Sequence, residues 1–121
     1  MALTLATVDS VGNMTRYAGG VGANDGDTVI DTSDVSRNDE FLLMSTAGAM
    51  QVFPSLDGTN YATDPLSLID MGATTTSPVT ATTANRIFGF YGTFAKVKVK
   101  QSGATAVTAA TLVMSKKGSQ F

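Results

Sequence analysis

Residues 96–100 alternate strictly between lysine and valine. A helix would scatter these side chains around its circumference, whereas a β-strand sends successive side chains to opposite faces. The segment 95–101 is therefore predicted to be a strand with one buried face and one solvent face. The buried face would carry Val97 and Val99, and the solvent face would carry Lys96, Lys98 and Lys100. A turn at 102–104 is expected to fold the next strand, 107–114, back on this one as an antiparallel hairpin.

Other segments show the same period of two, or short apolar runs bounded by turn residues. Only 15% of the residues are charged, and Thr, Ala, Gly, Val and Ser dominate, which favours strands over helices. The further predicted strands are 3–8, 29–30, 41–44, 50–56, 66–71 and 87–94, with a short one around 14–17 and a surface loop over 72–85. This pattern predicts an all-β fold, a small antiparallel β-sandwich or jelly roll of about eight short strands.

Several of these segments carry more specific signals. The run 41–44 is continuously apolar, which predicts a strand buried on both faces. Asp57-Gly58 is a strong hairpin turn signal, and Tyr61 would begin the returning segment. Pro54 has no N–H to donate, so its strand is predicted to lie at a sheet edge or a bulge. The aromatic side chains expected in the core share one parity, and they are Phe88, Phe90 and Phe94.

The 121 residues are expected to form a single domain over 1–121. Its parts would be a strand plus a flexible arm over 1–26, a body over 27–115 and a tail over 116–121. The arm is predicted because glycines stand at 12, 19, 20, 22 and 26. Such a stretch buries too little surface to offset the entropy of ordering itself. We expect the arm to order only against a partner, so that deleting residues 1–24 would leave the body folded.

The absence of both cysteine and histidine restricts the chemistry of this chain. It removes the usual zinc ligands, the commonest general base and the Ser-His-Asp and Cys-His catalytic arrangements. A net charge of −2 offers no basic stripe for nucleic acid. The chain also has no apolar run long enough to cross a bilayer. We expect a protein that is not an enzyme, uses no cofactor and binds neither nucleic acid nor membrane.

Carboxylates offer two candidate sites. The stretch 24–40 is dense in acidic residues, but its spacing lacks the Gly and Glu positions of an EF-hand loop. We interpret these residues as solvated turn carboxylates and predict no metal site, although calcium binding stays an alternative. Asp57 and Asp64 have no spacing that supports a glycosidase pair. No catalytic residue is predicted.

The lysine row is the candidate partner-binding surface. Lys96, Lys98 and Lys100 would stand about 7 Å apart along one strand face. They could dock an acidic partner. The alternative is a charged strand that prevents aggregation between sheet edges.

Three stretches together resemble a known family: 52–61 (VFPSLDGTNY), 90–99 (FYGTFAKVKV) and 103–108 (GATAVT). Residues 41–114 look like the small β-sandwich proteins of tailed bacteriophages, in particular the head decoration or cement proteins. The resemblance implies a structural protein that sits on the outside of a phage capsid. It also implies a sandwich or jelly-roll body that assembles as a homodimer or homotrimer.

From this resemblance we expect a virion protein that is made in the host cytoplasm and sits on the outer capsid surface. Its partners would be the major capsid protein and further copies of itself. The alternative is a phage tail adhesin or carbohydrate-binding module. In that case Tyr17, Tyr61 or Tyr91 would contact the glycan.

Overall fold

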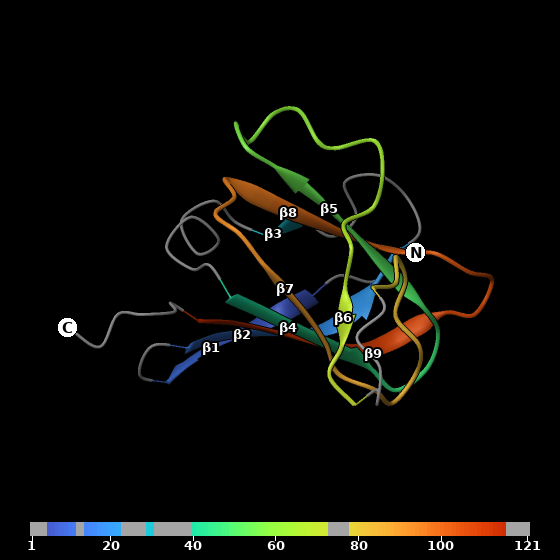
Figure 1. Cartoon of the computed structure of the whole chain (residues 1–121). Helices are drawn as coiled ribbons and strands as arrows, with labels where there is room; N and C mark the ends of the chain where they lie inside the picture. The colour runs from blue at the N-terminus through green and yellow to red at the C-terminus, as the bar shows by residue number, and fades with distance from the viewer. Residues whose placement is uncertain (1–4, 12–13, 23–28, 31–39, 73–77, 116–121) are drawn as a thin grey trace.

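The computed structural model describes residues 5–11, 14–22, 29–30, 40–72 and 78–115, and within these ranges the chain is all-β (Figure 1). The strands are β1 (Leu5–Val11), β2 (Met14–Val21), β3 (Val29–Ile30), β4 (Glu40–Ser45), β5 (Met50–Ser55), β6 (Ile69–Asp70), β7 (Phe88–Tyr91), β8 (Lys96–Gln101) and β9 (Val107–Ser115). A six-stranded sheet has the order β1-β2-β9-β4-β7-β6, and a three-stranded sheet has the order β3-β8-β5. The predicted all-β antiparallel fold is confirmed.

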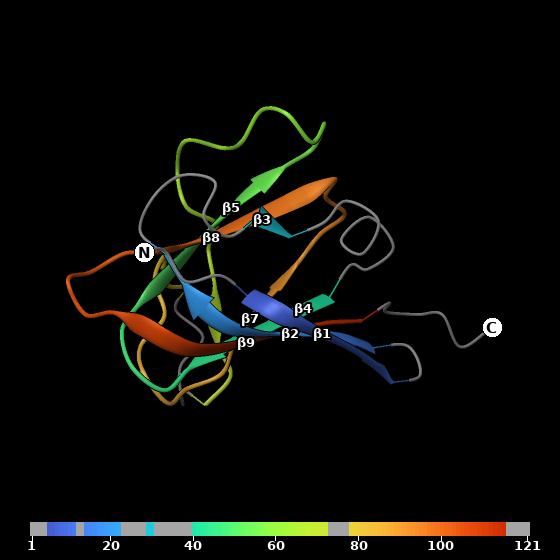
Figure 2. The same cartoon turned by 180° about the vertical axis from the view of Figure 1, so that it is seen from behind.

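The two sheets pack face to face, and both contribute to one apolar core (Figures 1 and 2). Alternation of buried and exposed side chains is regular in β8, where Val97 and Val99 point inward and the lysines outward. The aromatic row predicted for the core is buried as expected, with Phe88, Phe90 and Phe94 between the sheets. Periodicity therefore identified the inward faces of these segments correctly.

The predicted hairpin between the lysine strand and 107–114 is wrong. β9 pairs with β2 and β4 in the six-stranded sheet, whereas β8 pairs with β3 and β5 in the other sheet. The connection between β8 and β9 therefore crosses from one sheet to the other. Alternation fixes which face of a strand is buried, but it does not say which strand lies beside it.

The flexible arm is also wrong for residues 18–21, whereas the short strand predicted around 14–17 is confirmed. Residues 14–21 together form β2, which lies between β1 and β9, and Tyr17 and Val21 are buried in the core. The register of β2 against β9 shifts between Gly19 and Val21, and Gly19 has a φ of 150°. Glycine here permits an irregular strand, because a bulge needs backbone angles that other residues rarely adopt. Residues 12–13 and 23–26 of the predicted arm, and the tail 116–121, lie outside the described residues.

The segment 41–44 is not buried on both faces. Phe41 and Leu43 point into the core, but Leu42 and Met44 are half-buried on the outer face of the six-stranded sheet. The continuous apolar run thus combines a core face with an apolar outer face.

β5 is an edge strand of its sheet, as Pro54 predicted. The turn at Asp57-Gly58 returns the chain, and Tyr61 pairs with Ser55. The segment that follows runs beside β5, since the Ala62 N–H donates to the Pro54 carbonyl at 2.9 Å. β5 is thereby covered along its outer edge.

Two predicted features between 66 and 85 need adjustment. The strand predicted over 66–71 is reduced to β6, with a bridge from Leu68 to Val79. Residues 78–85 form no strand, as the predicted surface loop requires, but Thr82 is buried. Its Oγ1 accepts a hydrogen bond from the Met50 N–H at 2.9 Å. A polar side chain can be buried here because it satisfies a backbone donor.

Candidate functional site

The lysine row lies on the outer face of the three-stranded sheet, on its central strand β8. Lys96 is paired with Ser55, and its side chain runs beside Gly58 in the turn after β5. Lys98 is paired with Phe53, and Lys100 with Gln51. Lys96 therefore lies at the turn after β5, whereas Lys98 and Lys100 lie beside Phe53.

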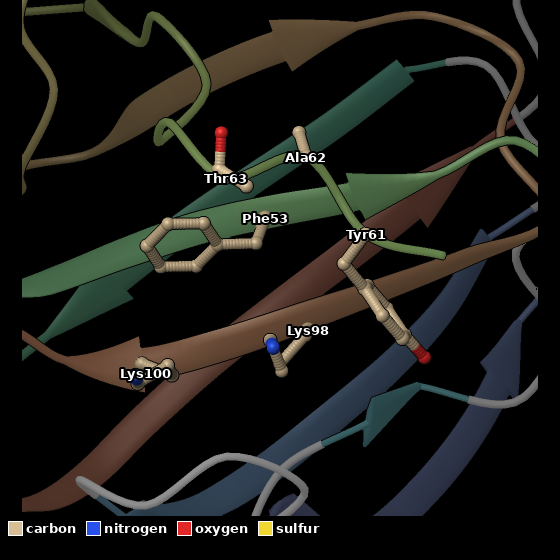
Figure 3. A pocket seen from close by; sticks show the side chains of 6 residues that line it. All are labelled: Phe53, Tyr61, Ala62, Thr63, Lys98 and Lys100. Atoms are coloured by element: carbon tan, nitrogen blue, oxygen red, sulfur yellow. The ribbon is translucent and has the colours of Figure 1, made fainter. Parts of the chain in front are cut away.

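Lys98 and Lys100 line a hollow of about 380 Å³ together with Phe53, Tyr61, Ala62 and Thr63 (Figure 3). The Lys98 ammonium lies over the Tyr61 ring, 4.7 Å from its centroid, and 5.7 Å from the centroid of Phe53. The Lys100 ammonium is also 5.7 Å from the Phe53 centroid. We call this set of residues the lysine-aromatic pocket.

The sequence predicts that the lysines of this pocket lie on one strand face, but the predictions did not include their contact with its aromatic rings. Phe53 points outward because its neighbour Val52 points inward, which is a parity signal present in the sequence. Tyr61 reaches the pocket because the turn after β5 returns the chain beside that strand. The turn signal at Asp57-Gly58 could therefore have placed Tyr61 near Phe53.

The turn that carries Tyr61 is fixed by Asp57. Its Oδ1 accepts hydrogen bonds from the N–H groups of Thr59 at 2.8 Å and Asn60 at 2.7 Å. Its Oδ2 accepts one from the Asn60 side-chain amide at 2.8 Å. These donors, the Asn60 backbone first, hold the pKa of the Asp57 carboxyl far below its usual range. Asp57 thus stabilises the turn as a charged acceptor.

The positive charge of the pocket comes from the ammonium groups of Lys98 and Lys100. Burial raises the pKa of the Tyr61 phenol above its usual value of 10.0. Tyr61 is therefore a neutral ring and hydroxyl at physiological pH. The pocket combines cationic groups, aromatic rings and the Thr63 hydroxyl.

Most of the acidic stretch 24–40 lies outside the described residues, including every aspartate in it. Among the residues that are described, no group of three or more acidic side chains could hold a metal ion. In the same part of the chain, no helix has the length and apolar character needed to span a bilayer.

A second surface lies on the outer face of the six-stranded sheet, on the opposite side of the sandwich (Figures 1 and 2). A shallow hollow of about 220 Å³ lies there, and the residues around it include Leu42, Met44, Ile87, Thr111 and Val113. Leu42 is paired with Val113, and Met44 with Thr111. Ile87 is 45% exposed and Met71 47%. We call this surface the apolar face.

Comparison with known proteins shows that this chain is similar in fold to a solved structure. No family model matches the sequence, and no curated protein matches it. Among solved structures, the crystal structure of the SPBc2 prophage-derived protein YomS is similar, with a TM-score of 0.61 and 15% sequence identity. The match covers 90% of this chain and 98% of that chain. At this identity the likeness establishes a shared fold over nearly the whole of YomS.

Proposed function

We propose that this chain is a structural protein of a phage particle. In this role it is a head decoration protein that binds the outside of the capsid and stabilises contacts between major capsid subunits. The shared fold with a prophage-derived protein supports the phage origin. One structural observation carries the proposal further: two chemically different surfaces lie on opposite faces of the sandwich.

A protein that reinforces a joint between subunits must contact more than one neighbour. The apolar face can supply binding free energy, since buried apolar area contributes roughly 25 cal/mol per Å². The lysine-aromatic pocket can supply charge complementarity, which orients a partner. Because the two surfaces face opposite ways, a single flat partner cannot cover both. The arrangement suits a capsid subunit on the apolar face and a second contact at the pocket.

This role requires neither a catalytic group nor a cofactor. The chain would be made in the host cytoplasm and would reside on the outer capsid surface. Its partners would be the major capsid protein and further copies of itself, as a homodimer or homotrimer.

The test is co-sedimentation of the purified chain with expanded capsids, followed by electron microscopy. We expect saturable binding by the wild type and much weaker binding by Met44→Glu, which places a charge on the apolar face. Thr105→Glu, in the exposed turn after β8, is the matched control and should bind like the wild type. Thermal melting should show that both variants remain folded. Failure of the wild type to decorate any expanded capsid would overturn the proposal.

A tail adhesin or carbohydrate-binding module is the second candidate. The observation that favours it is the pair of aromatic rings, Phe53 and Tyr61, lining one hollow. Tyr17 is buried in the core and so is unsuited to contact a glycan, whereas Tyr91 is 46% exposed. Binding on a glycan array that is lost in Tyr61→Ala would support this role. A flat array would contradict it.

A further inference from the structure

We propose that β1 (Leu5–Val11) pairs edge to edge with β1 of a second copy of this chain, so that two six-stranded sheets join across a two-fold axis. β1 is the outermost strand of its sheet, beside β2 (Figure 2). Use of such a dimer on a capsid rests on the proposed function. The pairing itself does not, because it follows from the strand edge alone.

The other sheet edges in the described part of the chain are short or covered. β3 has two residues. Along β5, the returning segment covers the edge, and the Leu66 N–H donates to the Val52 carbonyl at 2.8 Å. At the start of β6, Leu68 and Val79 exchange two backbone hydrogen bonds, at 2.6 and 2.9 Å. β1, by contrast, has seven residues and pairs with β2 alone among the described strands.

The sequence of β1 is that of a strand able to pair again. It reads LATVDSV, with no proline, no lysine and one charged residue, Asp9. Proteins commonly protect an exposed edge with Lys, Pro or a β-bulge. The device of this kind in β1 is the register shift between Leu5 and Thr7, which lies at the start of the strand. A regular edge therefore remains over residues 7–11.

The pairing of β1 with β2 identifies the backbone groups that this edge offers. Val11 and Met14 are paired with two residues between them, so they close a two-residue hairpin. Such a closing pair exchanges backbone hydrogen bonds, and bonded and non-bonded pairs alternate along an antiparallel ladder. Val11 and Asp9 therefore bond to β2. Val8 and Ser10 direct their N–H and C=O groups away from β2, toward the open edge.

A second copy fits this edge because two antiparallel copies of one strand offer each other the same groups. Two registers bring the outward groups together: Val8 opposite Val8, or Val8 opposite Ser10. The second register sets Asp9 opposite Asp9 of the second copy, and like charges directly opposite each other destabilise a pair. The first sets Asp9 opposite Thr7, so we expect the two-fold axis at Val8. Such an isologous contact closes at two copies, which selects a homodimer over a homotrimer.

The dimer is expected to be weak in free solution. A contact made by one strand edge is smaller than the roughly 1,200–2,000 Å² buried in a stable interface. We expect a dissociation constant of about 100 μM. Copies held close together on a particle would dimerise more readily, because their effective concentration is higher.

The experiment measures the oligomeric state of the full chain by sedimentation across protein concentrations, and amide hydrogen exchange by NMR in the same samples. We expect a monomer–dimer equilibrium in which the Val8 amide becomes protected as the dimer forms. The Asp9 and Val11 amides are the internal control, since their bonds to β2 should protect them at every concentration. A chain that stays monomeric up to about 1 mM, tenfold above the expected constant, would overturn the inference. A trimer would do the same.

Two variants at one position separate the backbone from the side chain. Val8→Pro removes the outward N–H at a place where an edge strand tolerates proline, and should weaken dimerisation at least about tenfold. Val8→Thr keeps the N–H and the β-branched shape, and should change the constant less than about threefold. Equal effects of the two variants, large or small, would contradict pairing through the backbone. Thermal melting checks folding, and the wild-type exchange data decide the question if Val8→Pro unfolds.

Co-sedimentation with capsids separates this inference from the proposed function. If the chain dimerises through β1 but decorates no capsid, the decoration role fails and the edge pairing stands. If the chain decorates capsids while Val8 stays unprotected, the edge pairing fails and the decoration role stands. If Val8 becomes protected only on the capsid and the free chain is monomeric, the edge takes a strand of the capsid protein, and pairing with a second copy is wrong.

Discussion

Phe41 and Phe90 are directly opposite each other on β4 and β7, and their rings are stacked with centroids 4.7 Å apart and planes within 3° of parallel. Phe94 packs against the same Phe41 ring, with centroids 5.8 Å apart. Cross-strand aromatic pairs contribute beyond their buried area. This cluster packs β7 against β4, which lies near the centre of the six-stranded sheet.

Phe90→Ala should therefore destabilise the fold by about 3–5 kcal/mol, because it removes a fully buried ring and its stacking partner's contact. Denaturant midpoints give the change. Tyr91→Ala is the control from the same strand, since Tyr91 has the opposite parity and is exposed. It should cost less than about 1 kcal/mol. A similarly small loss in Phe90→Ala would contradict the buried cluster.

Gly92→Ala should cost about 1–3 kcal/mol, since Gly92 has a φ of 150° and an added Cβ would stand 2.5 Å from Cζ of Phe94. The ring of Phe94 would have to shift from its position against Phe41. Gly103→Ala is the matched control, because nothing lies within 4 Å of the position its Cβ would take. It should change stability within about 0.5 kcal/mol. Urea unfolding of both variants tests this, and equal effects would show that crowding at Phe94 is unimportant.

Asp57 should make stability depend on pH in the acid range. Its folded pKa is lowered from the usual 3.8, so its contribution is fully present above 3.8 and is lost as pH falls toward the folded value. Asp57→Asn should be less stable than the wild type at neutral pH, and the difference should shrink below 3.8. Comparing the two proteins isolates Asp57 from Asp70, whose pKa is also lowered, chiefly by its hydrogen bond from Arg86. A difference that stays constant with pH would exclude the charge as the cause.

Deleting residues 1–24 should prevent cooperative folding, which reverses the expectation from glycine content. The deletion removes Tyr17 and Val21 from the core and leaves the β2 side of β9 without a neighbour. Circular dichroism and thermal melting check this directly. A truncated chain that melts like the full-length protein would show that β2 adds nothing to the fold.

The sequence predicts the direction of side chains better than the neighbours of strands. Strict alternation places Val97 inward and Lys98 outward, and both are correct because the period of a strand decides them. The pairing of β9 is not predictable in this way, since its partners β2 and β4 are far from it along the chain. The arm predicted over 18–21 is wrong because Gly19 and Gly20 belong to an irregular part of β2 rather than to a flexible segment.

The candidate site was predictable in part for the same reason. Lys98 and Lys100 follow from alternation within one strand. Their contact with Tyr61 depends on how the turn after β5 returns the chain, and on the pairing of β5 with β8. The apolar face was hidden because Leu42 and Met44 belong to an apolar run without alternation. Only the sheet shows which of those side chains face away from the core.

The position of β9 sets the order in which this protein can be completed during synthesis. β9 is the last of the described strands in the chain, yet it alone joins the β1-β2 hairpin to the β4-β7-β6 half of its sheet. While the ribosome is still making residues before 107, these halves have no shared strand to join them. The sheet must therefore close after translation has passed β9, a late and non-local step that slows folding. A nascent chain that stops before β9 would expose two unpaired strand edges, one on β2 and one on β4, at which other chains could pair and aggregate.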